Sequence, residues 1–186
     1  MATDHPLKRL VALAPEDFAA WLLGQDVHHV TLRQGELTAE PIDADLVMDV
    51  TLWNDQALIL HLEFQGPGSH RPMPLRVLDD QTRFALTARE VPVHSVVISL
   101  AGAGATDTGV HQLLDATGQP RVRWQYTVIR LWQLPAEALV ALQRPALLAL
   151  VGQTRIDQPA QVIPQVLAQM GQHTHGEQRE RLLSEL

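Results

Sequence analysis

The stretch LILHLEFQGPG, residues 58–68, decides the fold, because it has the apolar character of a core strand and ends at a Gly-Pro-Gly break. Glu63 and Gln65 lie inside it, two residues apart. On a β-strand, residues with that spacing point to the same side of the sheet. A carboxylate buried in a strand is costly unless a proton or a cation neutralises it. The stretch therefore predicts a core strand that carries a functional site, and we develop the hypothesis of a metal site.

The segment around this strand predicts a β-hairpin. Two β-rich runs, 45–53 and 56–65, are separated by Asn54-Asp55, a common turn pair. Antiparallel pairing around that turn brings Asp45 nearly opposite Glu63. Two facing carboxylates repel each other, so the pair must take up a proton or hold a cation. Mg²⁺ prefers oxygen ligands, and a metal held there could activate water against a phosphodiester.

The rest of the sequence predicts an α/β fold, with a mixed central sheet flanked by helices and a helical C-terminal tail. Periodicity and boundary residues indicate helices over 14–24 and 73–90 and strands over 91–104 and 121–134. The expected apolar face of the helix over 73–90 consists of Leu75, Leu78, Phe84 and Leu86. Residues 27–41 indicate a short strand or a loop, and 105–120 a turn-rich connection. We expect a main domain over 1–150 and a helical extension over 151–186.

Composition narrows the possible functions. The chain has 186 residues, of which 46% are hydrophobic, so it can bury a continuous core. It has no cysteine, which excludes disulfides and thiolate chemistry, and any catalytic lysine must be Lys8, since the chain has no other. A net charge of −7 argues against nonspecific coating of nucleic acid. Because no apolar run is long enough to span a membrane and the first residues do not resemble a secretory signal, we expect a cytoplasmic protein.

Five segments in order, ELTAEPIDADLVMDV, ALILHLEFQ, MPLR, VPVHSVVISL and YTVIRLWQL, resemble the Rpn family of transposase-type nucleases in the PD-(D/E)xK superfamily, over roughly residues 30–150. The resemblance implies a restriction-endonuclease-like core and cleavage of DNA with Mg²⁺ or Mn²⁺. It implies the motif aspartate at Asp45, the Glu-x-Gln pair at Glu63 and Gln65, and an auxiliary acid at Glu40 or Glu36. The superfamily's lysine is replaced by Gln65, whose amide can orient water or phosphate but supplies no positive charge.

The helix after the Gly-Pro-Gly break departs from this family. Related sequences tend to read Arg-x-x-x-Tyr after Met-Pro, whereas this chain has Arg76 followed by Asp80. Arg76 is a candidate phosphate contact, and the alternative is an ion pair on the helix surface with Asp79 or Asp80.

Other charged and titratable residues have two interpretations each. Arg121 and Arg123 alternate with Arg130 along the expected strand, so they either line a DNA groove or lie on a solvated face of the sheet. His61 shares the face of Glu63, where it acts as a proton-transfer or supporting group or is a hydrogen-bonded core histidine. The histidine pairs His28-His29 and His173-Thr-His175 lack the helical spacing of zinc ligands.

Two functional hypotheses follow. The first is a metal-dependent DNA endonuclease, in which Asp45 and Glu63 bind the metal, Gln65 positions water or phosphate, and Glu40 assists. The second is a catalytically silent module with the same fold that binds a protein or a nucleic acid. Cutting both strands of a duplex takes two sites, which makes a homodimer a candidate assembly, although no heptad repeat or obvious apolar patch supports it.

Overall fold

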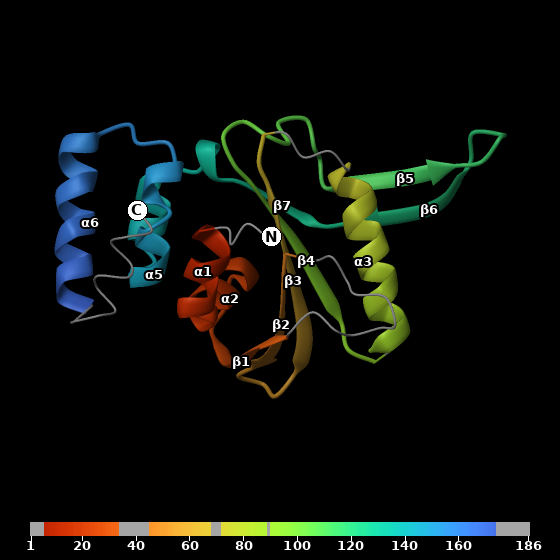
Figure 1. The fold of residues 1–186 in the computed structure, drawn as a ribbon, viewed down its shortest axis with the longest axis horizontal. Helices are drawn as coiled ribbons and strands as arrows, with labels where there is room; N and C mark the ends of the chain where they lie inside the picture. Colours follow the sequence, from red (N-terminus) through yellow and green to blue (C-terminus); the bar gives the residue numbers. More distant parts are fainter. Residues whose placement is uncertain (1–5, 34–44, 68–71, 89, 174–186) are drawn as a thin grey trace.

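A five-stranded mixed sheet forms the centre of the protein, and helices cover both of its faces (Figure 1). The computed structural model describes residues 6–33, 45–67, 72–88 and 90–173. The strands lie in the order β1-β2-β3-β4-β7; the first three are antiparallel and the last three parallel. Their bounds are β1 (Val27–Arg33), β2 (Leu46–Leu52), β3 (Ala57–Gln65), β4 (Val93–Ser99) and β7 (Thr127–Arg130). The expected α/β class with a mixed sheet is confirmed.

The β2–β3 hairpin turns at the residues that the sequence indicates. Asp55 has a positive φ of 61°, a conformation that Asp and Asn adopt more readily than most residues. The Asn54 side-chain Oδ1 accepts a hydrogen bond from the Gln56 N–H at 3.1 Å. These local bonds fix the register of the hairpin, and that register determines which side chains face each other at its open end.

Strand β3 is buried on both faces, and the two faces differ in chemistry. Leu60, Leu62 and Phe64 belong to the large apolar core that α1 (Pro6–Leu13) and α2 (Pro15–Leu23) cover. The alternate residues His61 and Glu63 are fully buried on the other face, which α3 covers. The buried polar side chains of β3 thus lie on the face of the sheet that α3 covers.

Helices occupy the two sides unequally (Figure 1). Most of the described helices gather on one side, with α6 outermost, and α3 (Met73–Thr87) is the described helix that covers the other. Val162, Val166 and Met170 of α6 join the same apolar core as the sheet, so the C-terminal helix contributes to the main core. The helices of the larger layer are α1 (Pro6–Leu13), α2 (Pro15–Leu23), α4 (Ala136–Val140), α5 (Pro145–Leu148) and α6 (Pro159–His173). Two short 3₁₀ turns accompany them: η1 (Leu131–Gln133) connects β7 to α4, and η2 (Val151–Gln153) connects α5 to α6.

Helix α3 buries a different face from the expected one. Leu75 and Leu86 are 43% and 66% exposed, so their assignment to the apolar face is wrong. The buried positions are Met73, Val77, Asp80 and Phe84, which follow the i, i+4, i+7 spacing of one helical stripe. An aspartate therefore lies in the middle of the buried stripe.

The segment after β4 also differs from expectation. The turn-rich connection contains β5 (Val110–Leu114), which pairs with β6 (Pro120–Gln125) in a separate two-stranded sheet. The single strand expected over 121–134 is wrong, because it is divided into β6, β7 and η1. We call the β5–β6 hairpin the arm, since it projects beyond α3 (Figure 1). Trp124 of the arm packs beside Met73, and its indole N–H donates to the Pro74 carbonyl at 2.9 Å.

The sequence also missed helix α1, which precedes the expected helix over 14–24. Within the described part of the chain, none of the helices has the length and apolar character that crossing a membrane requires.

Candidate metal centre

The carboxylates of Asp45 and Glu63 meet at the open end of the β2–β3 hairpin. Leu46 pairs with Leu62, so the register continues to place Asp45 opposite Glu63. The Asp45 N–H donates to Glu63 Oε1 at 3.0 Å, and the Phe64 N–H donates to Asp45 Oδ2 at 2.8 Å. The expected closeness of the two acids is confirmed.

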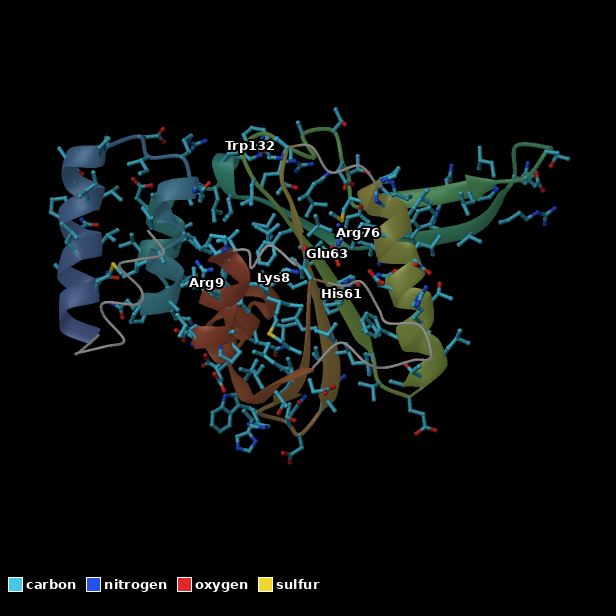
Figure 2. All side chains as sticks on the ribbon, in the orientation of Figure 1. Lys8, Arg9, His61, Glu63, Arg76 and Trp132 are labelled. Carbon is cyan, nitrogen blue, oxygen red and sulfur yellow. The ribbon has the colours of Figure 1, made fainter. Side chains whose placement is uncertain are left out.

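Two basic side chains neutralise this pair from opposite directions (Figure 2). Arg76, on α3, forms an ion pair with Glu63 Oε2, and its guanidinium lies 3.9 Å from Asp45 Oδ2. Lys8, on α1, places its Nζ 2.8 Å from Asp45 Oδ1. The cations that the sequence led us to expect beside the two acids are therefore side chains of the protein itself, and the pair does not need a metal to be stable.

His61 links Glu63 to a third acid, Asp80, which the sequence did not place in the site. His61 Nε2 lies 3.2 Å from Glu63 Oε1 and 3.6 Å from Asp80 Oδ2. One ligand atom from each of these three side chains lies within 4.8 Å of the others, a spacing that a single metal ion can bridge. A histidine nitrogen and two carboxylate oxygens form a donor set suited to a divalent transition metal.

The orientation of His61 is held from its other side. Its Nδ1 lies 3.2 Å from Ser95 Oγ, and that oxygen accepts a hydrogen bond from Gln81 Nε2 at 3.0 Å. With its proton on Nε2, His61 donates toward Glu63, while Nδ1 accepts from the Ser95 hydroxyl. This bonding pattern satisfies the imidazole without a metal, so the two interpretations of His61 remain.

Burial changes the acidity of Asp80. It raises the pKa of the Asp80 carboxyl from its usual 3.8 to about 6. The nearby His61 lowers this pKa and the nearby Glu63 raises it. Asp79 and Arg76 have smaller effects: the negative Asp79 raises the pKa and the positive Arg76 lowers it. Asp80 thus changes its charge within a pH range in which an ordinary aspartate is already ionised.

Gln65 lies on the same side of β3 as Glu63 but contacts a different part of the protein. Its Oε1 accepts a hydrogen bond from Ser99 Oγ at 3.4 Å. A Cβ added at Gly104 would lie 2.4 Å from the same oxygen, so the backbone after β4 passes directly over the amide. The amide of Gln65 is therefore held toward β4 and the loop that follows it.

The other predicted site residues lie elsewhere. Glu40, with the alternative Glu36, falls outside the described residues. Arg121 and Arg123 are on the arm, where Arg121 pairs with Asp115 at 2.6 Å. Arg130 is on β7 and donates to the Gly104 carbonyl. The expectation that the three arginines alternate along one strand is wrong, because they belong to two different sheets.

Fold and site together define an α/β protein whose central sheet carries a buried, ion-paired acidic cluster at the end of a hairpin. Comparison with protein families, curated proteins and solved structures gave no match for this chain.

Proposed function

We propose that this protein is a metal-dependent DNA endonuclease with a restriction-endonuclease-like fold. The observation that carries the proposal is the pairing of Asp45 and Glu63 across the β2–β3 hairpin, linked by a bond from the Asp45 N–H to Glu63. A hairpin that carries the acids, followed by helix α3 and the parallel strand β4, supports the fold assignment.

The residues at the hairpin end fit a divalent cation. The position between the two carboxylates already attracts positive charge, since the Arg76 guanidinium contacts both. Asp45 is 18% exposed, which leaves the pair open to solvent on one side. Mg²⁺ or Mn²⁺ bound by Asp45 and Glu63 would activate water and stabilise the charge that develops on a phosphate.

Arg76 has a second role in this mechanism, which is to bind the substrate phosphate. A guanidinium forms paired hydrogen bonds with phosphate oxygens as readily as with carboxylates. When a divalent cation neutralises Glu63 and Asp45, Arg76 is released from them and becomes able to hold the scissile phosphate. Arg76 is therefore kept as a candidate phosphate contact, in a role that begins when the metal binds.

DNA outside the cleavage point would meet the arm. Arg121 and Arg123 lie on β6, and a two-stranded β-ribbon has the dimensions to enter a major groove. We retain them as DNA contacts, and we place the enzyme in the cytoplasm, as a homodimer when both strands are cut.

The second candidate function is a catalytically silent module that binds a protein or a nucleic acid. One observation favours it: Lys8 and Arg76 already balance the charges of Asp45 and Glu63, so the cluster is a complete structural unit without a metal.

Plasmid cleavage separates the two candidates. Wild-type protein is incubated with supercoiled plasmid in Mg²⁺ or Mn²⁺, beside Asp45→Asn, Glu63→Gln and the control Asp55→Asn in the hairpin turn. We expect wild type and the control to nick the plasmid and the two site variants to lose activity by at least 100-fold. A loss of roughly 100-fold or more is the scale seen when a group that stabilises the charge of the transition state is removed, and loss of the metal would have that effect here.

The same proteins are titrated with Mn²⁺ by calorimetry. Binding by wild type that is lost in Asp45→Asn and Glu63→Gln supports the metal centre. Cleavage that survives both substitutions excludes the proposed site, and absence of both cleavage and binding favours the silent module.

A further inference from the structure

The only lysine of the chain contacts the acidic pair. Of the 14 Lys and Arg residues of the chain, Lys8 is the one lysine and the others are arginines. Its Nζ lies 2.8 Å from Asp45 Oδ1. Helix α1 holds it there, because Leu10 and Val11 are buried in the main core and Val11 lies one turn after Lys8. The contact joins two segments that are far apart in the sequence.

An exposed ion pair alone would be unremarkable, since such pairs contribute between roughly 0 and 1 kcal/mol to stability. Two further observations distinguish this one. Its partner is Asp45, the acid that faces Glu63, and the Lys8 side chain is still 34% exposed. A ligand that approaches Asp45 from solvent therefore meets the ammonium group at the same place.

Of the two cations that contact the acidic pair, Lys8 is the one that a substrate can reach directly. Gln65, which stands in place of the superfamily's lysine, carries an uncharged amide that is held toward Ser99. Arg76 is engaged with the fully buried Glu63 and is less exposed than Lys8, so it reaches a phosphate only after a divalent cation has displaced it. A lysine ammonium is a compact charge with three donors, which suits a single phosphate oxygen.

We propose that Lys8 is the catalytic cation of this site, supplied by helix α1 in place of a lysine on β3. It contacts a non-bridging oxygen of the scissile phosphate and stabilises the negative charge that grows there during hydrolysis. This inference rests on the proposed nuclease function.

Lys8 keeps its own protons throughout the reaction. The oxygen of a water molecule forms a bond to phosphorus while one P–O ester bond breaks. The attacking water releases a proton to solvent, and the leaving ester oxygen takes one up from solvent. Lys8 changes the rate through charge and position only.

The single lysine allows a direct observation that does not depend on activity. Reductive methylation with ¹³C-formaldehyde labels Lys8 and the α-amino group and preserves their charge. The Lys8 resonance is identified by its absence in Lys8→Arg. We expect Asp45→Asn to shift it, and a short DNA duplex in Ca²⁺ to shift it in the wild-type protein while the α-amino resonance stays in place. A Lys8 resonance that does not move at saturating duplex overturns the proposal.

Single-turnover cleavage tests the same contact kinetically. We expect Lys8→Met to lower the cleavage rate by roughly 100-fold or more and Lys8→Arg to restore part of it. The neighbouring Arg9→Ala serves as the control and should keep the wild-type rate. Lys8→Met should still bind Mn²⁺ at least as tightly as wild type, because it removes a competing cation, so that a slow rate with intact metal binding reports the loss of a substrate contact.

The outcomes separate the two proposals. If wild type cleaves and Lys8→Met cleaves equally fast, the role of Lys8 is refuted and the nuclease function stands. If wild type neither cleaves DNA nor binds Mn²⁺, the nuclease function itself fails.

Discussion

The buried Asp80 predicts an unusual dependence of stability on pH. Its pKa is about 6 in the folded protein and close to 3.8 in the unfolded chain. Between these values the folded state binds more protons than the unfolded state, so the contribution of Asp80 to stability falls as pH rises from about 4 to 6. At about 1.36 kcal/mol per pH unit, the full effect above pH 7 is a destabilisation of at most about 3 kcal/mol.

Asp80→Asn isolates this effect, because it removes the ionisable group and nearly preserves the shape. We expect the variant and the wild type to be about equally stable at pH 4. Above pH 6 the variant should be more stable, by up to about 3 kcal/mol. The free energy of unfolding is measured in urea at several pH values from 4 to 7.5, in EDTA, so that trace metal does not contribute.

Asp79→Asn is the matched control. Asp79 is the preceding residue on α3, its side chain is 36% exposed, and it pairs with Arg83. Asp79 raises the pKa of Asp80 by less than burial does, so the difference between Asp79→Asn and wild type should change with pH far less than that of Asp80→Asn. If the difference for Asp80→Asn is equally flat, or if that variant is the less stable protein above pH 6, then Asp80 is not held in a destabilising environment and our reasoning is refuted.

Two further comparisons use helix α3, each measured from the urea midpoint. Arg76→Ala leaves the fully buried Glu63 without its cation and should cost about 3–5 kcal/mol, whereas Arg83→Ala removes a surface pair and should cost about 0.3–0.5 kcal/mol. Equal costs would mean that the Glu63 pair contributes no more than a surface pair. Phe84→Ala should lower the free energy of unfolding by about 3–5 kcal/mol, because Phe84 is fully buried. Leu86→Ala should stay within about 0.5 kcal/mol of wild type, because Leu86 is exposed. A large loss of stability in Leu86→Ala would show that the helix face expected from the sequence was right.

The hairpin and its facing acids were predictable because they depend on local signals. The Asn54-Asp55 turn sets the register, and the two-residue period of a strand then fixes which side chains share a face. Asp45 and Glu63 consequently lie where the sequence indicates.

The buried face of α3 was not predictable by the same means. Asp80 occupies the centre of the stripe, and a polar residue there conceals the apolar period of Met73, Val77 and Phe84. If Asp80 is treated as a buried position, the helical spacing of Met73, Val77 and Phe84 becomes complete. That regular spacing is the signal in the sequence that could have revealed the burial of Asp80.

The cations of the site depended on tertiary structure. Lys8 and Asp45 are brought together by the packing of α1, which no local pattern specifies. The arm was missed for a different reason: most of the side chains of β5 are exposed, so its sequence lacks the alternation that marks a strand packed on a core.

The attachment of the arm has a consequence for how the chain can vary. A two-stranded ribbon is marginally stable alone, so its order depends on neighbours such as the contact of Trp124 with the start of α3. The dependence runs in one direction, since the five main strands complete their ladder without β5 or β6. Changes in the length of the turn between β5 and β6 would leave the ladder intact, so this turn is the place where insertions and deletions disturb the fold least.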